Sequence, residues 1–204
     1  MQKINYQKKL DMIIENLGDV VPSLLLHSCC APCSSYCIEY LSQYFNITVL
    51  YYNPNIYPEV EYEKRKAEQK RLISEMDTKY PVKMFDCDFE SEKFYEMAKG
   101  LEICREGGER CFKCYRLRLE KTAVEAKNNG FDYFTTTLTI SPLKNAQKIN
   151  EIGEGLSREY GVKFLPSDFK KREGYKRSIE LSKVHNLYRQ DYCGCIYSKL
   201  KNNE

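Results

Sequence analysis

The sequence lacks several features that would place the protein in a membrane or outside the cell. It has no Trp and only two His among 204 residues, and no apolar run approaches the ~20 residues that a membrane-spanning helix needs. Residues 1–23 hold Ile and Leu at the spacing of an amphipathic helix, without the continuous apolar stretch of a signal peptide. We therefore expect a cytoplasmic protein with an N-terminal helix within 1–23 and no membrane partner.

The sequence also lacks internal repeats, low-complexity tracts and flexible linkers, which predicts one domain over residues 1–204. Apolar residues make up 42% of it and charged residues 30%, as in soluble globular proteins. Ten cysteines are nevertheless present. Because the cytoplasm keeps thiols reduced, so many of them indicate metal, redox or catalytic chemistry rather than a disulfide framework.

Short apolar segments alternate with amphipathic ones along the chain. The predicted strands are 23–30, 46–53, 81–88, 131–140 and 162–169, with helices between them. This alternation predicts an α/β fold with a mainly parallel, Rossmann-like sheet of about five strands, flanked by helices in three layers. Functional groups in such sheets gather at the carboxyl ends of the strands. The residues at those ends are Cys29, Cys30, Cys87, Asp88, Ser167 and Asp168.

Seven of the cysteines stand in three motifs: Cys29-Cys30-x-x-Cys33, Cys111-x-x-Cys114 and Cys193-Gly194-Cys195. A tetrahedral zinc accepts four ligands, fewer than these motifs offer. Two adjacent cysteines are expected to point in different directions, which suits the separate corners of an iron–sulfur cluster. The spacing favours such a cluster over zinc, which stays an alternative. The other cysteines, Cys37, Cys87 and Cys104, are expected to be mostly core or isolated thiols.

The one-residue spacing of Cys193 and Cys195 marks a different kind of pair. A disulfide over so tight a loop would be strained and easily reduced, so the pair is a candidate redox couple or second metal site. We expect the segments 99–118 and 189–198 to form cysteine-bearing loops at the active site, the first of them leading into a helix from about Phe112 to Asn128.

Basic side chains concentrate in two segments, 99–121 and 168–189. Each holds seven basic residues, against four and three acidic ones, in a chain whose net charge is only +3. Such clustering suits a polyanion such as RNA, although solvated helix faces would show the same pattern.

The stretches "LLLHSCCAPCSS", "YYNPNIYP", "EGGERCFKCYRLRLEKTA", "GFDYFTTTLTISPLKNAQKINEIG" and "LYRQDYCGCIYS" closely resemble the QueH-type epoxyqueuosine reductases. The resemblance runs from about Leu24 to Ser198. It implies an adenine-nucleotide α-hydrolase-like (HUP-type) fold and the last step of queuosine biosynthesis. In that step the epoxide oxygen of epoxyqueuosine, already at the wobble position of tRNA, is removed without cobalamin. It further implies a [4Fe–4S] cluster with an adjacent mononuclear iron and an unidentified low-potential electron donor.

The resemblance also implies roles for particular residues. The cluster ligands would be Cys29, Cys30, Cys111 and Cys114, and the redox pair would be Cys193 and Cys195. Cys33 and Asp168 are candidates for the second iron or its surroundings, with Asp86 and Asp88 behind them. Tyr192 or His27 would deliver a proton. Residues suited to bind RNA by stacking or by phosphate contacts are Arg110, Lys113, Tyr115, Arg116, Lys170, Lys171, Arg172, Lys176 and Arg177.

Two other functions remain open at this point. A zinc-stapled RNA-binding module would use the same cysteines without catalysis. A nucleotide-dependent tRNA-modifying enzyme would share the α/β architecture, but "HSCCAPCSS" has Cys and Pro where a phosphate-binding loop needs glycines.

Overall fold

The computed structural model describes residues 4–201, with residues 200 and 201 described only by their backbone. Five parallel strands form one sheet in the order β3-β2-β1-β4-β5. The strands are β1 (Ser23–His27), β2 (Asn46–Leu50), β3 (Lys83–Phe85), β4 (Tyr133–Thr136) and β5 (Lys163–Phe164).

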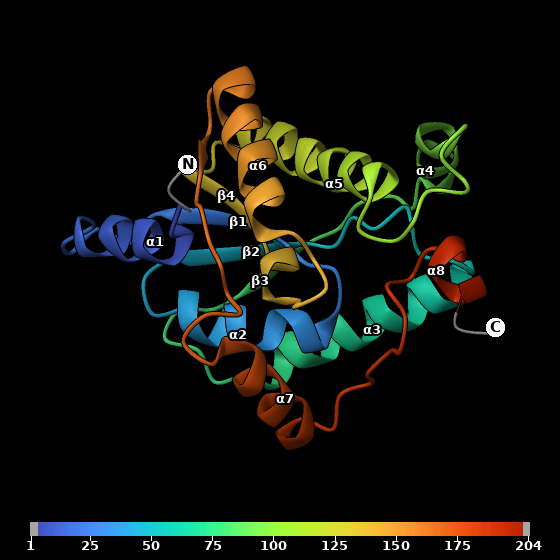
Figure 1. Cartoon of the computed structure of the whole chain (residues 1–204). Coiled ribbons are helices and arrows are strands. Elements are labelled where there is room, and N and C mark those ends of the chain that lie inside the picture. The colour runs from blue at the N-terminus through green and yellow to red at the C-terminus, as the bar shows by residue number, and fades with distance from the viewer. Residues whose placement is uncertain (1–3, 202–204) are drawn as a thin grey trace.

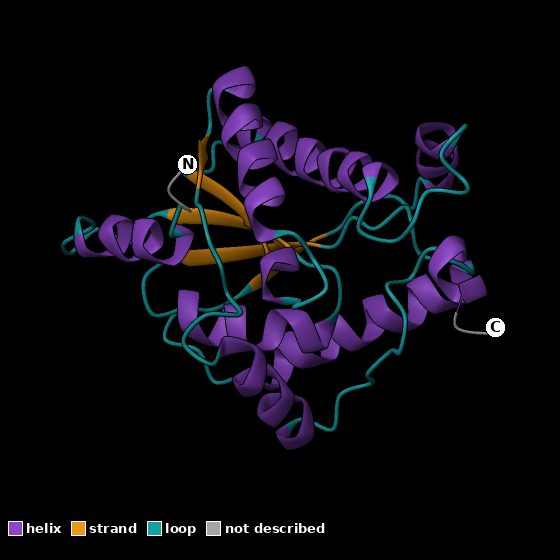
Figure 2. Cartoon of the chain, viewed as in Figure 1, coloured by secondary structure: helices purple, strands orange, loops and turns teal. Residues whose placement is uncertain are grey.

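Helices cover both faces of this sheet. In Figures 1 and 2, α5 and α6 lie on one side of the strands, and α2, α3 and α7 lie on the other. This confirms the predicted three-layer α/β fold. The helices are α1 (Tyr6–Glu15), α2 (Ala31–Leu41), α3 (Glu59–Glu75), α4 (Ser91–Ala98), α5 (Glu109–Asn128), α6 (Ala146–Tyr160), α7 (Gly174–Val184) and α8 (Ile196–Lys201).

The central strand β1 is buried on both faces, which explains its uninterrupted apolar sequence. Leu25 packs into the core with residues of α5 and α6, whereas Leu24 and Leu26 pack into a second core with residues of α2. Successive side chains of a strand point to opposite faces, so three leucines in a row serve both layers.

The order of the strands creates a crevice at the carboxyl end of β1. The chain passes from β1 outward to β2 and β3, and then returns to β4 on the other side of β1. Ligands of open α/β sheets bind where the connections diverge in this way. Here Cys29 follows β1 and Thr137 follows β4, and the backbone N–H of Cys29 donates to Thr137 Oγ1 at 3.3 Å.

All five strands are shorter than predicted, and the strands expected over 81–88 and 162–169 pair only over Lys83–Phe85 and Lys163–Phe164. The expected strand 131–140 pairs only over Tyr133–Thr136 and then becomes a 3₁₀ helix, η1 (Thr137–Ile140), because the hydroxyl of Thr136 caps it by accepting from the N–H of Leu138 at 3.1 Å. The helix expected from about Phe112 begins earlier, at Glu109, directly after the extended Gly108. Both Cys111 and Cys114 therefore lie in the first turns of α5.

No helix in the part of the chain described is both long and apolar enough to cross a lipid bilayer.

Candidate metal and redox site

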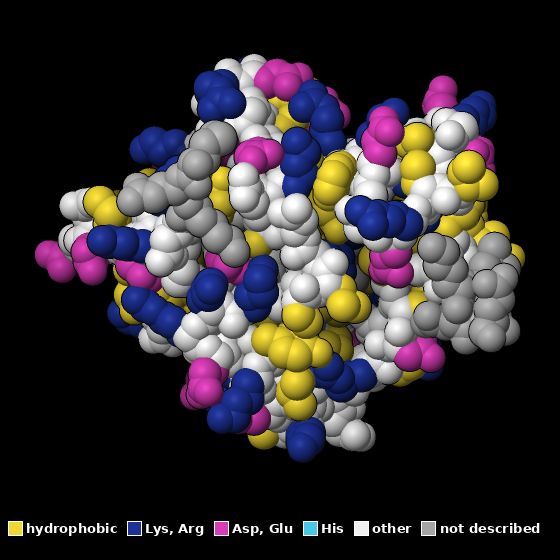
Figure 3. All heavy atoms as spheres, viewed as in Figure 1, with side chains coloured by type: hydrophobic (Ala, Val, Ile, Leu, Met, Phe, Trp, Pro, Cys, Tyr) yellow, Lys and Arg dark blue, Asp and Glu magenta, His cyan; other side chains and the backbone are white. Residues whose placement is uncertain are grey.

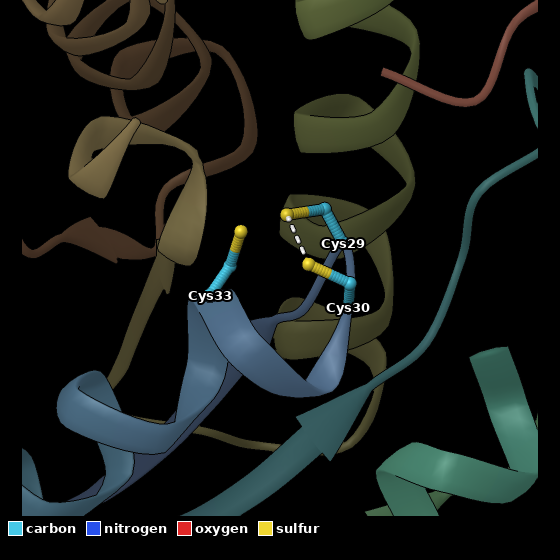
Figure 4. A group of neighbouring side chains, drawn as sticks. All are labelled: Cys29, Cys30 and Cys33. Carbon is cyan, nitrogen blue, oxygen red and sulfur yellow. Dashed lines mark hydrogen bonds between the residues drawn. The ribbon is translucent and has the colours of Figure 1, made fainter. Parts of the chain in front are cut away.

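Three sulfurs meet at the carboxyl end of β1. The Sγ atoms of Cys29, Cys30 and Cys33 all lie within 4.8 Å of one another, and Figure 4 shows them turned toward the same space. Cys30 is extended (φ −173°, ψ 159°) and caps α2, and Pro32 and Cys33 follow in the first turn of that helix. This sharp change from strand to helix brings the adjacent sulfurs of Cys29 and Cys30 to 3.9 Å. The expectation that they diverge was wrong, and Cys33 joins them.

The three thiols share their protons unequally. The pKa of Cys29 lies well below its ordinary value because the thiols of Cys30 and Cys33 hydrogen-bond to it. The same bond to Cys29 raises the pKa of Cys30 to about 12. Thr137 Oγ1 lies 3.6 Å from the sulfur of Cys29. The triad thus combines one thiol whose pKa is lowered with two whose pKa is raised, and three sulfurs at this spacing are a donor set suited to a thiophilic metal.

The remaining motif cysteines form a second group beside the first. Cys114 is buried against Cys195, and Cys111 accepts a hydrogen bond from the N–H of Gly107 at 3.2 Å. Burial, together with the nearby sulfurs of Cys193 and Cys195, raises the pKa of Cys114 to about 12. Among the described residues, however, only Cys29, Cys30 and Cys33 are close enough to share one metal ion. A [4Fe–4S] cluster takes its thiolates at separate, more widely spaced corners, so the assignment of Cys29, Cys30, Cys111 and Cys114 as its ligands stays a prediction.

A cavity of about 370 Å³ joins the two groups. Cys29 and Cys33 line it from one side and Cys193 from the C-terminal segment, while Leu143 and Tyr175 belong to its rim. Leu143 is 81% exposed, which is unusual for a leucine beside a polar cavity. Figure 3 shows hydrophobic side chains in the middle of this face, between α6 and α7, with basic side chains around them.

Two cations also line the cavity, and the sequence alone gave them no such role. Arg118 is only 1% exposed, and Lys144 is half-buried. Burial lowers the pKa of Lys144, but the sulfurs of Cys193, Cys29 and Cys33 outweigh it and the pKa is raised. Arg118 stands four residues after Cys114, on the same face of α5, and that spacing is the signal that could have found it.

Comparison with known proteins identifies the family. The model of the family "Epoxyqueuosine reductase QueH" matches residues 24–201. The chain belongs to the QueH family. A relative of that name from Staphylococcus epidermidis is 47% identical over 98% of this chain and 87% of its own length. One from Streptococcus pyogenes is 44% identical over 97% of this chain and 79% of its own length. One from Thermotoga maritima is 36% identical over 89% of this chain and 93% of its own length.

The family name describes an oxidoreductase, so this QueH chain is an enzyme of that class. Its C-G-C segment is held tightly against the rest of the site. The N–H of Tyr57 donates to the carbonyl of Gly194 at 2.8 Å, and Arg65 Nη1 donates to the carbonyl of Cys193 at 3.4 Å. Tyr192 lines the cavity, and its hydroxyl donates to the carbonyl of Tyr57 at 2.8 Å. All ten cysteines are free thiols in this structure, so the redox role of Cys193 and Cys195 stays a prediction.

His27 does not face the cavity as a proton donor, which corrects that expectation. It is fully buried, and its Nε2 lies 3.0 Å from the carbonyl of Tyr52, which can only accept. Its Nδ1 therefore accepts from the hydroxyl of Thr136 at 2.9 Å. Burial and the neighbouring Arg118 lower its pKa to about 3. Both nitrogens are occupied and the ring is neutral.

The predicted carboxylate ligands do not reach the sulfurs either. Asp168 pairs with Lys170 at 2.8 Å, and the exposed Asp86 pairs with Lys70 at 3.2 Å. Asp88 is exposed, and none of the three belongs to a metal-sized group in the described chain. The reason is topological, because β5 and β3 are the outer strands while the triad follows the central one.

The predicted RNA-binding residues divide into buried and ion-paired groups. Arg110 and Tyr115 are 2% and 3% exposed, so they offer no surface to RNA, which corrects those two predictions. Arg110 instead donates to the carbonyls of Leu101 and Glu102 at 2.7 and 2.9 Å. Most of the others have carboxylate partners, namely Lys113 with Glu109, Arg116 with Glu159, Lys170 with Asp168, Arg172 with Asp11, Lys176 with Glu173 and Arg177 with Glu39. Lys171 is exposed and stays a prediction.

Several buried donors near the sulfur triad have no hydrogen-bond acceptor. They are the hydroxyl of Tyr51, Nη2 of Arg65 and Nε2 of Gln69. Gln69 accepts from the hydroxyl of Ser28, directly before Cys29, at 2.6 Å, and Tyr51 and Arg65 lie close enough to Cys30 for its protonation state to affect their pKa values. Unpaired buried donors are costly, and a sulfide-rich anion is an acceptor that would satisfy them. The residues present thus fit an iron–sulfur group.

Proposed function

We propose that this chain reduces epoxyqueuosine to queuosine at the wobble position of tRNA, using an iron–sulfur centre held by its cysteines. The observation that carries the proposal is the sulfur triad at the switch point of the sheet, opening into a cavity that Cys193 also lines. Family membership supports the reaction, because the relatives are named for it.

The donor set suits the proposed cofactor better than it suits a single zinc. Cys29, Cys30, Cys111 and Cys114 would hold a [4Fe–4S] cluster, and Cys33 is an additional thiol beside the first two. An adjacent mononuclear iron would take its ligands from the same group of sulfurs. When bound, these metals would supply electrons singly and a Lewis acid for the epoxide oxygen.

Lys144 is the residue best placed to deliver a proton. Opening the epoxide to an alkene consumes two electrons and two protons and releases the oxygen as water. Lys144 lines the cavity beside Cys29 and Cys193, and no carboxylate among the described residues pairs with it. We infer that its Nζ hydrogen-bonds the epoxide oxygen and gives it a proton. Tyr192, on the same wall, stays the second candidate.

The rim of the cavity suits a base turned out of an RNA loop. Specific RNA recognition stacks splayed bases on aromatic, apolar or Arg surfaces. Tyr175 and Leu143 offer such surfaces beside the exposed Arg189, and about 370 Å³ is within the range of small-ligand sites. We infer that the modified base enters here and that Cys193 and Cys195 relay electrons from an external low-potential donor.

Nucleoside analysis tests the reaction directly. Epoxyqueuosine-tRNA is incubated with the anaerobically reconstituted, reduced protein and digested, and mass spectrometry follows the loss of one oxygen atom to give queuosine. A Lys144→Met variant should lose at least tenfold in kcat with little change in KM. The matched control is Lys148→Met, an exposed lysine paired with Glu151 at 3.3 Å.

Metal analysis of the same preparation separates the cofactor from the reaction. Iron with acid-labile sulfide supports the cluster, whereas one zinc and no sulfide would overturn it. Unchanged epoxyqueuosine in the presence of an intact, reduced cluster would reject the assigned reaction.

A further inference from the structure

Arg118 is a buried cation with unusually few partners. It is 1% exposed, its Nε donates to the carbonyl of Cys114 at 3.3 Å, and its Nη1 donates to Asn53 Oδ1 at 3.4 Å. Its Nη2 is buried and has no partner at all. Within residues 4–201, no carboxylate forms an ion pair with it. A buried charge normally needs a counter-charge, so this guanidinium calls for an explanation.

The other two buried arginines have partners that compensate their charge. Arg65 pairs with Glu61 at 2.7 Å. Arg110 donates two short bonds to backbone carbonyls and lies 4.3 Å from the ring centre of Tyr197. Arg118 has two long bonds to neutral acceptors and lies 5.9 Å from the ring centre of Tyr115, further than Arg110 lies from Tyr197. Its charge is therefore the least compensated of the three.

Arg118 instead lies near residues of all three cysteine motifs. It lines the same cavity as Cys29 and Cys193, and Cys114 lies one turn before it on α5. Burial alone would lower its pKa, yet these three sulfurs raise it. Asn53, which accepts from Arg118, donates to the carbonyl of Ser28 at 2.8 Å, directly before Cys29. Arg118 is thus fixed between the two groups of cysteines.

We propose that Arg118 is the counter-ion of the sulfur centre: its fixed positive charge balances the negative charge of the bound cluster and raises the reduction potential. This inference rests on the proposed function, since it assumes that the cysteines hold an iron–sulfur group. Because Arg118 touches neither substrate nor the reacting atoms in this assignment, it is a positioning and tuning residue. A reduced cluster carries one more negative charge than an oxidised one, so a nearby buried cation favours the reduced form.

The direct test is a redox titration monitored by electron paramagnetic resonance. Arg118→Gln keeps polar atoms but removes the charge, Arg118→Met removes both, and Arg118→Lys keeps the charge. The two neutral variants should lower the equilibrium constant for one-electron reduction at least tenfold, which corresponds to about 59 mV. Arg118→Lys should stay within about threefold of the wild type.

Denaturant unfolding of the metal-free protein distinguishes a counter-ion role of Arg118 from a role in stabilising the fold. A charge without a partner costs stability in the apoprotein, so Arg118→Met should unfold at the same or a higher denaturant midpoint than the wild type. Arg65→Met is the matched control, because it strands Glu61 without its partner and should unfold at a clearly lower midpoint. A folded Arg118→Met apoprotein that takes up less iron than the wild type would also support the counter-ion role.

The proposal is overturned if the neutral variants keep the wild-type potential, or if apo Arg118→Met loses as much stability as Arg65→Met. A wild-type protein that binds no iron or sulfide would instead overturn the proposed function itself. The two failures are therefore distinguishable in one set of preparations.

Discussion

At the scale of single residues, burial decides what a titratable side chain can do. His27 stands two residues before the sulfur triad, but it is fully buried with its Nε2 facing the carbonyl of Tyr52. Thr136 completes its bonding through Nδ1, and the same hydroxyl accepts from the N–H of Leu138. The imidazole therefore joins the ends of β1, β2 and β4 as a neutral group. It holds the strand ends beneath the site together and takes no part in the chemistry.

This assignment makes the stability of the protein depend on pH in a defined window. The pKa of His27 is lowered from 6.5 to about 3, so between these values the unfolded chain binds a proton that the folded chain does not. The free energy of unfolding should therefore rise with pH across this window, by about 1.4 kcal/mol per pH unit from this residue. His27→Gln should remove that contribution to the slope in denaturant unfolding measured from pH 4.5 to 6.5. His185→Gln, at the end of α7, should keep it, and equal slopes in both variants would refute the assignment.

At the scale of elements, three chain segments must be held against one another to build the cavity. Cys29 and Cys33 line it after β1, Arg118 lines it from α5, and Cys193 lines it from the C-terminal segment. The C-terminal segment has no sheet or long helix to hold it at this point. Its position depends on Gly194, whose φ of 120° and close contact with Arg65 require a residue without Cβ.

Gly194→Ala should therefore loosen this segment specifically. A Cβ there would lie 3.1 Å from Arg65 Nη1 and from Ile56 Cγ1, on a backbone conformation that alanine rarely adopts. We expect a loss of about 1–3 kcal/mol in the free energy of unfolding and faster alkylation of Cys195, which is only 9% exposed.

Gly155→Ala is the matched control for this change. Gly155 lies inside α6 with nothing within 4 Å of the added Cβ, so the substitution should stabilise the protein by about 0.5–1 kcal/mol. Wild-type stability and unchanged protection of Cys195 in Gly194→Ala would contradict the proposed role of the glycine.

At the scale of the whole molecule, the arrangement of charge matters more than its total. The net charge is +3, and many exposed cations are already neutralised by a carboxylate on the protein, as Arg177 is by Glu39 at 2.7 Å. Arg189 differs, because it lines the cavity and bonds to the hydroxyl of Ser182 at 3.0 Å, without an ion pair in the described chain. Arg189 is therefore a cation available to phosphate groups at the cavity.

We predict that Arg189→Ala weakens tRNA binding and reduces the slope of log K against log salt concentration by about one. Arg177→Ala should leave both nearly unchanged, because its charge is internally balanced. Filter binding or fluorescence anisotropy over a series of salt concentrations measures both quantities. Equal slopes for the wild type and Arg189→Ala would show that this arginine contacts no phosphate.

The sequence by itself determined the alternation of strands and helices, the parallel sheet and the family of this protein. These properties depend on local periodicity and on motifs such as Cys29-Cys30-x-x-Cys33, which are visible in a few consecutive residues. The sequence also placed Cys29 at the right end of the right strand, since parallel strands send their carboxyl ends to one edge.

Only the tertiary structure decided which of these groups meet. The distance from Cys111 to Cys29 depends on how α5 packs beside the central strand, and the distance from Asp168 to both depends on the position of β5. Each of these elements is more than thirty residues from the central strand in the sequence. Packing also turned Arg110, Tyr115, Arg118 and His27 inward, although their types suit a surface equally well. Burial is a property of the folded arrangement, because it depends on distant segments that no local pattern in the chain encodes.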